Sequence, residues 1–143
     1  FHPYFTREGG VPTLEMQILV PIQEHNEFNN NIVLIAEDFS NDEEYVEMAF
    51  KAYGQEINSF VITRALAQFE RSLISGQSDF DKEFNYKIEG TMSTSALRGK
   101  ALFESDRTKC SSCHSGFNFT NYTFQNNELG GSVASPPYLL TSI

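Results

Sequence analysis

The chain has 143 residues, of which 40% are hydrophobic and thirteen are phenylalanine. This is enough apolar material for one ordinary domain or two small ones, and it argues against disorder. The formal net charge of −9 argues against nucleic acid or an anionic membrane as a partner, whereas a basic partner protein would suit that field. No apolar run is long enough to predict a membrane span.

Helical patterns begin after a loop-like start. Thr13 is predicted to cap a short helix that ends at Pro21. The polar segment 21–28 is expected, from its composition alone, to be a solvated loop. Asparagines 29–31 can cap a helix that runs to Phe39.

The next two helices have clearer boundaries. Ser40 and Glu43 match a capping box, which predicts a helix that ends at Gly54. The best-patterned helix runs from about residue 57 to 75 and is followed by Gly76, a typical residue just past a helix end. Its apolar residues recur at steps of three and four, which indicates one buried stripe.

Arg71 falls off that stripe and is predicted to face solvent. A short helical turn is expected at 78–84, followed by a linker at 85–92. A final helix is predicted from Ser93 or Thr94 to about Glu104. Because no stretch alternates at period two for long, the fold class predicted is all-α.

The stretch after this helix, Cys110-Ser111-Ser112-Cys113-His114, carries the clearest chemistry in the chain. Cys-x-x-Cys-His is the attachment pattern of a c-type haem. On one helical turn two thiols can reach the two vinyl groups of the porphyrin and form thioethers, and the imidazole can bind the iron. Cys110 and Cys113 are therefore predicted to hold haem c covalently, with His114 as the proximal iron ligand.

Two cysteines at this spacing have three other roles open to them: a structural disulfide, half of a zinc site and a redox dithiol. Zinc would need further ligands from a second Cys/His cluster, which the sequence lacks. A redox dithiol would be expected in a strand–helix–strand setting, which is also missing. Haem attachment is favoured, and since c-type haem is attached outside the cytoplasm, the motif indicates the periplasm.

Several separated stretches together resemble the bacterial di-haem cytochrome c peroxidases, a family that includes relatives associated with methylamine utilisation. They follow one another in the family's order and cover most of residues 5–125. The matching stretches are Glu8-Gly9-Gly10-Val11-Pro12-Thr13-Leu14-Glu15, Pro21-Ile22-Gln23 with Glu27-Phe28, residues 65–76 with Phe80-Asp81, and residues 97–103 leading into Cys110–His114 and Gly116-Phe117-Asn118-Phe119-Thr120.

The resemblance implies a pair of cytochrome c-like helical domains, here incomplete. Family members carry one CxxCH in each domain. Residues 1–90 would be the latter part of the first, peroxidatic haem domain, and 91–143 the opening of the second, electron-accepting one. The chain begins with Phe1 and not with Met, and we interpret it as a trimmed piece whose first CxxCH lies upstream.

The resemblance also implies an activity. The intact parent would reduce hydrogen peroxide with electrons from a small cytochrome c or a cupredoxin. Glu27 stands where the family has a glutamate proposed to move protons at the peroxidatic haem, a task that suits a positioned carboxylate. The alternative is a mono-haem electron-transfer module without peroxidase activity. A homodimer of the parent stays open, and the family's interdomain calcium uses ligands outside this chain.

The chain departs from the family pattern at several positions. Arg7 stands where many members have a tryptophan between the two haems. The distal ligand of the second haem is usually a methionine well after the CxxCH, but Met16, Met48 and Met92 all precede it. From about Glu128 onward the chain no longer matches the family.

Overall fold

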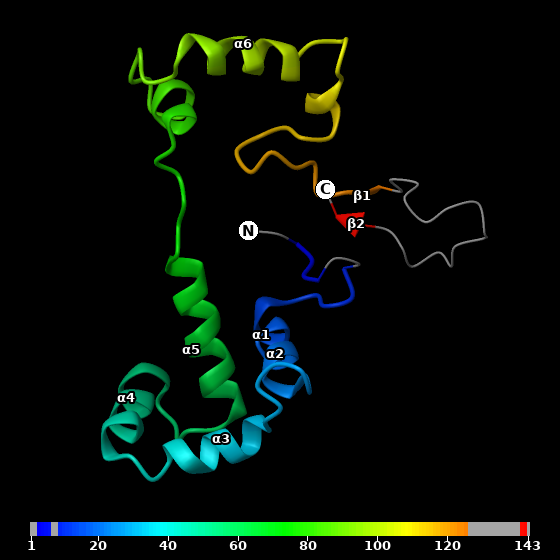
Figure 1. Ribbon diagram of the computed structural model, residues 1–143. Coiled ribbons are helices and arrows are strands. Elements are labelled where there is room, and N and C mark those ends of the chain that lie inside the picture. Colours follow the sequence, from blue (N-terminus) through cyan, green and yellow to red (C-terminus); the bar gives the residue numbers. More distant parts are fainter. Residues whose placement is uncertain (1–2, 7–8, 126–140, 143) are drawn as a thin grey trace, which may run out of the picture. The chain divides into compact units, whose positions relative to one another are not determined.

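The computed structural model describes residues 3–6, 9–125 and 141–142 (Figure 1). Its helices are α1 (Leu14–Gln17), α2 (Leu19–Gln23), α3 (Ile32–Phe39), α4 (Glu43–Tyr53), α5 (Ser59–Ser72) and α6 (Thr94–Phe103), with a π-helical turn at Asp81–Asn85 and a 3₁₀ turn at Cys110–Ser112. The strands β1 (Phe124–Gln125) and β2 (Thr141–Ser142) form one short antiparallel pair. The predicted all-α class is confirmed.

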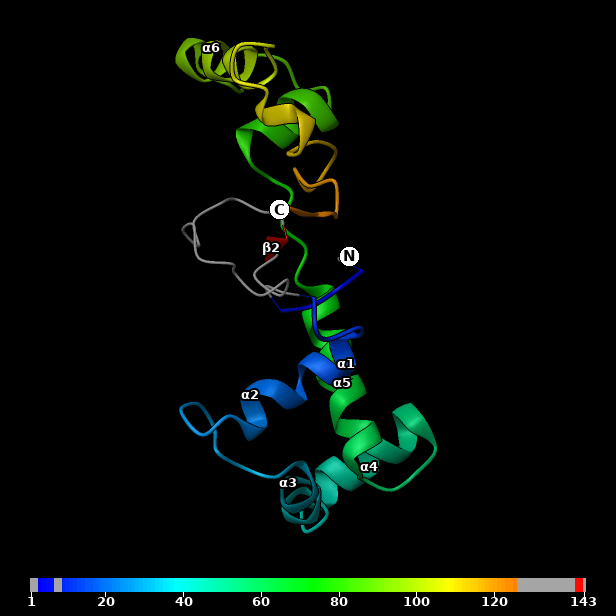
Figure 2. The same ribbon diagram turned by 90° about the vertical axis from the view of Figure 1, so that its right-hand side faces the viewer.

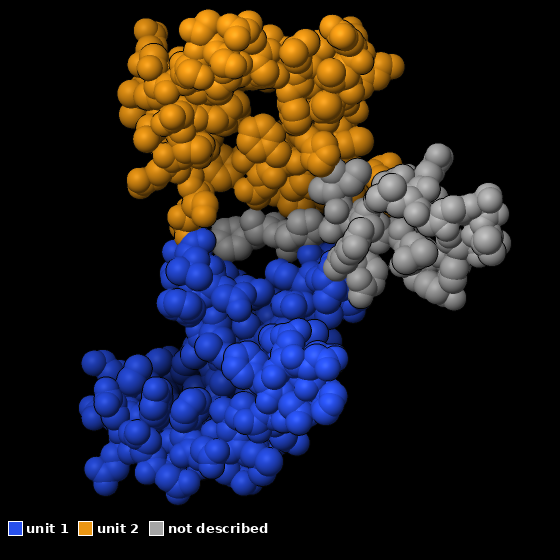
Figure 3. All heavy atoms as spheres, in the orientation of Figure 1, with its two compact units in different colours: residues 1–73 blue, residues 74–143 orange. Residues whose placement is uncertain are grey.

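The chain divides into two compact units, Phe1–Leu73 and Ile74–Ile143 (Figure 3). Unit 1 holds α1 to α5, and unit 2 holds α6, both turns and the strand pair. The predicted boundary at residue 90 concerns haem-binding domains rather than compact units. It therefore stays a prediction.

Unit 1 has a hydrophobic core built by helices that lie far apart in the sequence. In both ribbon views α1 lies beside α5, and α3 also packs on α5 (Figures 1 and 2). The core consists of buried side chains from α2, α3, α5 and the α1–α2 link: Ile18, Ile22, Ile32, Ala36, Ile62 and Ala67. The predicted stripe of the long helix is buried only at Ile62, since Leu66, Phe69 and Leu73 are 41%, 61% and 64% exposed. The face of α5 that packs on the core carries Ile62 and the fully buried Ala67, so the prediction of one buried stripe through residue 73 is wrong.

The first helical segment differs from its prediction. Thr13 caps α1 as expected, since its hydroxyl accepts a hydrogen bond from the Met16 N–H at 3.2 Å. Pro21 does not end the helix, because the chain continues as α2 to Gln23. Pro21 is the third residue of α2, where the N–H that proline lacks would have no partner within the helix.

The predicted capping box at Ser40 is wrong. Asp42 caps α4 by accepting from the Glu44 N–H at 2.9 Å, and the Ser40 hydroxyl instead donates to the Ala36 carbonyl at the end of α3. Gly54 does end α4, with a φ of 69° that suits glycine. The long helix is shorter than predicted at both ends, with Asn58 as its N-terminal cap.

Arg71 does not face solvent, contrary to the prediction. Its Nη1 lies 2.7 Å from Glu15 Oε1, and both side chains are partly buried. The pair joins the end of α5 to α1. The Arg71 hydrogen bond lowers the pKa of Glu15, and the same contact raises the pKa of Arg71.

The side chains of unit 2 that the structure describes are less buried than those of unit 1. Ser93 caps α6 by accepting from the Ala96 N–H at 3.2 Å, as predicted. Between residues 74 and 125, no side chain that the structure describes is buried. This part of the chain holds the CxxCH motif without a closed hydrophobic core around it.

Candidate haem-binding site

A tight turn places the two cysteines next to one another in unit 2. Lys109 adopts a left-handed φ of 53°, and the 3₁₀ turn starts at the residue after it. The N–H of His114 then donates to the Cys110 carbonyl at 2.9 Å. Both cysteines are free and partly exposed. The backbone thus brings two thiols and the imidazole onto one turn.

The turn is tied to the end of α6. The Ser105 hydroxyl donates to the Leu102 carbonyl at 2.7 Å, and the Lys109 N–H donates to the Ser105 carbonyl at 3.0 Å. The Ser112 hydroxyl closes the turn by donating to the Lys109 carbonyl at 2.6 Å. The orientation of the CxxCH motif therefore depends on where α6 ends.

A hydrogen bond fixes the imidazole of His114. Its Nδ1 lies 3.1 Å from the Phe119 carbonyl oxygen. A carbonyl oxygen only accepts, so Nδ1 must carry the hydrogen, which leaves the lone pair of a neutral ring on Nε2. This arrangement suits a histidine that binds a metal through Nε2 and holds its orientation through Nδ1.

Phe119 is held in an unfavourable backbone conformation to make this contact. Its φ is 52°, in the left-handed region that a bulky residue rarely adopts. Gly116, with a φ of 72°, turns the chain ahead of it. Strain of this kind costs on the order of 1–3 kcal/mol and tends to occur at functional sites.

Aromatic rings surround this contact. The Phe103 ring centroid lies 6.4 Å from that of His114 and 6.1 Å from that of Phe119. Phe80, from before the π-helical turn, packs edge-on against Phe119 at 5.0 Å. The structure thus brings Phe103 and Phe119 beside His114. Phe80 was missed, because no local pattern links it to a residue 39 positions away.

These residues fit a c-type haem. The donor set is two thiols and one imidazole with an available Nε2, and aromatic side chains lie around it. In the described part of the chain no three Cys, His, Asp or Glu side chains gather as a metal cluster. Attachment of haem at Cys110, Cys113 and His114 stays a prediction.

Glu27 lies in unit 1, on the loop between α2 and α3. Its side chain is exposed and makes no hydrogen bond or ion pair with the residues that the structure describes. Pro21 and Phe28, on either side of it, line an apolar groove of about 770 Å³ in unit 1, although Glu27 does not. The groove runs between α2, α3, α4 and α5.

Gln17 was missed by the sequence analysis. Its side-chain Oε1 is buried and has no hydrogen-bond partner among the described residues. An unpaired buried acceptor is costly and calls for an explanation. The sequence offers no signal for it, because a glutamine inside a helix usually faces water. Arg7, where the family has tryptophan, lies outside the described residues.

The helical fold and the CxxCH turn define a cytochrome c-like class of protein. A sequence model described as "Di-haem cytochrome c peroxidase" matches residues 1–88. The chain therefore belongs to the di-haem cytochrome c peroxidase family, as the sequence motifs indicated.

Two curated relatives carry the name "Methylamine utilization protein MauG". The protein from Methylorubrum extorquens is 33% identical over 141 residues, which cover 93% of this chain and 39% of the relative. The protein from Methylophilus methylotrophus is 34% identical over 119 residues, or 82% of this chain and 35% of the relative. The chain thus spans less than half the length of either relative.

Proposed function

We propose that this chain is part of a periplasmic di-haem enzyme that reduces hydrogen peroxide, and that Cys110–His114 attach the electron-accepting haem. The observation that carries the proposal is the His114 contact: Nδ1 donates to the Phe119 carbonyl, and Nε2 stays available beside two free thiols. The family match ends at residue 88, close to the predicted start of the second haem domain.

Each residue has a defined task in this proposal. The thiols of Cys110 and Cys113 would hold the haem covalently through two thioether bonds. His114 offers Nε2 to the iron, and Phe119 holds the ring in place. The bound haem would supply one-electron transfer. Glu27 would hold and release a proton at the peroxidatic centre in unit 1.

The unit 1 groove supports the proposal of a peroxidatic centre in unit 1. Its volume of about 770 Å³ lies within the range of about 300–1,000 Å³ that is usual for cofactor sites. Its lining is mostly apolar, and two residues that flank the Glu27 segment belong to it. The expected partners are hydrogen peroxide and a small cytochrome c or cupredoxin as electron donor.

The first experiment tests haem attachment. The full-length protein, expressed with a c-type maturation system, should hold haem that survives acid–acetone extraction and gives a c-type α band as the pyridine haemochrome. Cys113→Ala should lose one thioether, whereas Ser111→Ala should keep both. A haemochrome without the c-type band would disprove attachment.

The second experiment tests Glu27. In the full-length protein Glu27→Gln should lower peroxide turnover about 10²- to 10⁴-fold, the usual contribution of a general acid or base, and leave both haem spectra unchanged. Glu24→Gln is the matched control, since Glu24 is exposed on the same loop. Equal turnover in the two variants would return Glu27 to the role of a solvated loop residue.

A mono-haem electron-transfer module is the competing function. It is favoured by the single CxxCH in this sequence. The gene upstream of Phe1 distinguishes the two functions, because a second CxxCH there supports the di-haem enzyme. A full gene without one would leave only the electron-transfer module.

A further inference from the structure

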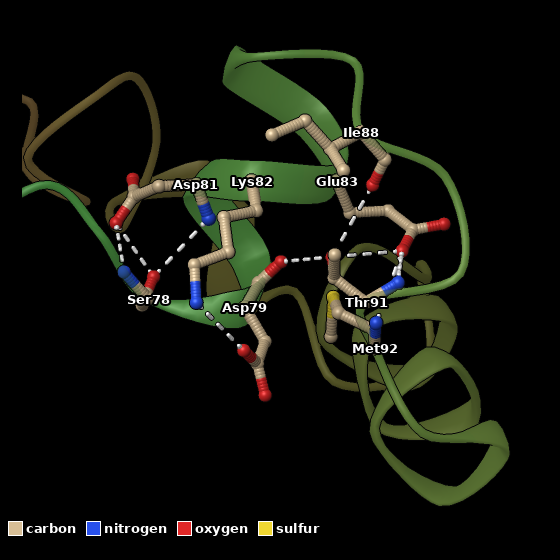
Figure 4. A network of polar contacts seen from close by, with 8 residues as sticks. All are labelled: Ser78, Asp79, Asp81, Lys82, Glu83, Ile88, Thr91 and Met92. Atoms are coloured by element: carbon tan, nitrogen blue, oxygen red, sulfur yellow. Dashed lines mark hydrogen bonds and ion pairs between the residues drawn. The ribbon is translucent and has the colours of Figure 1, made fainter.

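A carboxylate in unit 2 joins two segments that are separate in sequence. Glu83 belongs to the π-helical turn, and its Oε2 lies 2.6 Å from the Thr91 N–H nitrogen and 3.0 Å from that of Met92 (Figure 4). Thr91 and Met92 directly precede Ser93, the cap of α6. Glu83 therefore connects the turn to the start of this helix.

The Thr91 hydroxyl can donate its hydrogen to Glu83 or to another acceptor. It lies 2.8 Å from the Asp79 carbonyl oxygen and 3.0 Å from Glu83 Oε2, and it has a single hydrogen to donate (Figure 4). The N–H groups of Thr91 and Met92 are fixed by the backbone and cannot rotate toward another acceptor. These contacts, led by the Met92 N–H, lower the pKa of Glu83, so the carboxylate is charged near neutral pH.

Both segments that Glu83 joins carry a ring that packs on Phe119. Phe80 precedes the π-helical turn and contacts Phe119 at 5.0 Å. Phe103 is the last residue of α6 and contacts the same ring at 6.1 Å. The carbonyl of Phe119 in turn accepts the hydrogen of His114 Nδ1. A continuous set of contacts thus leads from Glu83 to the imidazole.

We propose that Glu83 is a positioning residue for His114: its carboxylate ties the Phe80 turn to α6, and the two rings hold Phe119 where its carbonyl accepts from the imidazole. This inference rests on the proposed role of His114 as iron ligand. The turn itself is also fixed from within, since the Ser78 hydroxyl donates to Asp81 Oδ2 at 2.6 Å. The Asp81 contacts stay within the turn, whereas Glu83 accepts from Thr91 and Met92, just before the cap of α6.

The test uses the full-length protein with its haem and the variants Glu83→Ala, Glu83→Gln and Glu83→Asp. Hydrogen–deuterium exchange follows the peptides that contain residues 90–92 and 114–120, and a redox titration gives the midpoint potential of the haem attached at Cys110. Glu89→Gln is the matched control, because Glu89 is exposed and only six residues away.

In Glu83→Ala both peptides should exchange about tenfold faster, the effect of losing about one hydrogen bond's worth of local stability. The midpoint potential should rise, because a weaker Nδ1–H···O contact makes the imidazole a poorer donor to oxidised iron. Glu83→Gln still offers an acceptor oxygen and should stay within about threefold of the unaltered protein.

The inference would be overturned if the 90–92 peptide exchanged faster while the exchange of the 114–120 peptide and the midpoint potential stayed unchanged. Glu83 would then stabilise only its own contact with residues 91 and 92. If Glu83→Ala fails to accumulate, Glu83→Asp decides, because its shorter side chain cannot reach both amides and must show the same faster exchange at 114–120. A protein without covalent haem would disprove the proposed function, whereas the exchange rates would still decide the role of Glu83.

Discussion

At the scale of single residues, the Glu15–Arg71 ion pair joins the first helix of unit 1 to its last helix. Glu15 lies in α1 and Arg71 near the end of α5, 2.7 Å apart across 56 positions of sequence. Exposed ion pairs contribute little to stability, but this one is partly shielded from water. Its contribution should therefore be measurable through its dependence on pH.

The pair should stabilise the protein at neutral pH and lose this effect in acid. The pKa of Glu15 is lowered from its usual 4.5 in the folded state, so the unfolded chain binds the proton first as pH falls. The stabilisation is full above about pH 4.5 and disappears as pH falls through the folded pKa. Urea midpoints of the unaltered protein and Glu15→Gln should differ at pH 7 and converge in acid.

Glu47→Gln serves as the control for this comparison, since Glu47 is exposed on α4. Its urea midpoint should follow that of the unaltered protein at both pH values. A Glu15→Gln difference that persists unchanged in acid would mean that packing, rather than charge, accounts for the effect.

The ion pair shows why single residues were the least predictable part of the fold. Arg71 lies off the apolar stripe of its helix, and helical periodicity assigns such a residue to solvent. Its partner belongs to a helix more than fifty residues earlier, and only tertiary packing brings the two together. The prediction that Gly76 directly follows the long helix is also wrong, because α5 ends at Ser72. The contact at Gly76 is again a tertiary one, since a Cβ there would lie 3.2 Å from the Tyr86 hydroxyl.

At the scale of elements, side-chain caps set where the helices begin. Asn31, Asp42, Asn58 and Ser93 each accept a hydrogen bond from an N–H in the first turn of α3, α4, α5 or α6. The Asn58 contact to the Val61 N–H, at 3.1 Å, starts the helix that packs on both α1 and α3. Loss of this cap should therefore be felt throughout unit 1.

Asn58→Ala should lower the free energy of unfolding by about 1 kcal/mol, the usual cost of losing an N-terminal cap. Urea denaturation of the full-length protein gives this value. Asn58→Ser keeps a capping oxygen and should retain most of the stability. Equal losses in both variants would show that the asparagine acts through something other than its cap.

The elements that the sequence predicted well are those with local signals. The helices α3 and α6 have both a capping residue and an apolar pattern, and their predicted starts agree with the structure. The π-helical turn at Asp81–Asn85 was expected only as a helical turn, because its wider hydrogen bonds leave no distinct residue pattern. The pairing of β1 with β2 joins two-residue strands, which are too short to show alternation.

In the candidate haem-binding site, too, only the features with a local sequence signal were predictable. The CxxCH motif and the nearby Phe103 and Phe119 are visible from local sequence. The bond from His114 to the Phe119 carbonyl was not predictable, because it requires a left-handed phenylalanine, which residue preferences disfavour. Glu83 was also missed, since nothing in its neighbours distinguishes it from an exposed charge.

At the scale of the molecule, charge is divided unevenly between the two units. Residues 1–73 hold twelve of the nineteen acidic residues and only four of the ten basic ones. The acidic field that favours a basic partner therefore arises from unit 1, whereas the unit with the CxxCH motif is nearly neutral. The net charge of the whole chain therefore describes the field around unit 1 rather than the field around His114.

The junction of the units should be an early site of proteolysis. Leu73 and Ile74 are 64% and 80% exposed and follow the end of α5. Thermolysin cuts before large apolar residues, so limited digestion of the full-length protein should give a first cut at this junction, located by mass spectrometry. Replacing both residues by serine should delay it. A first cut within α5 or α6 would contradict the division into two units.

The openness of unit 2 has a consequence for the order in which the protein matures. Among residues 74–125 no described side chain is buried, so this segment gains little from folding alone, whereas a bound porphyrin would give Phe80, Phe103 and Phe119 a common surface to cover. If haem is attached at Cys110–His114, we expect it to act as a template: the turn is accessible to the maturation machinery first, and residues 80–119 pack on the haem afterwards.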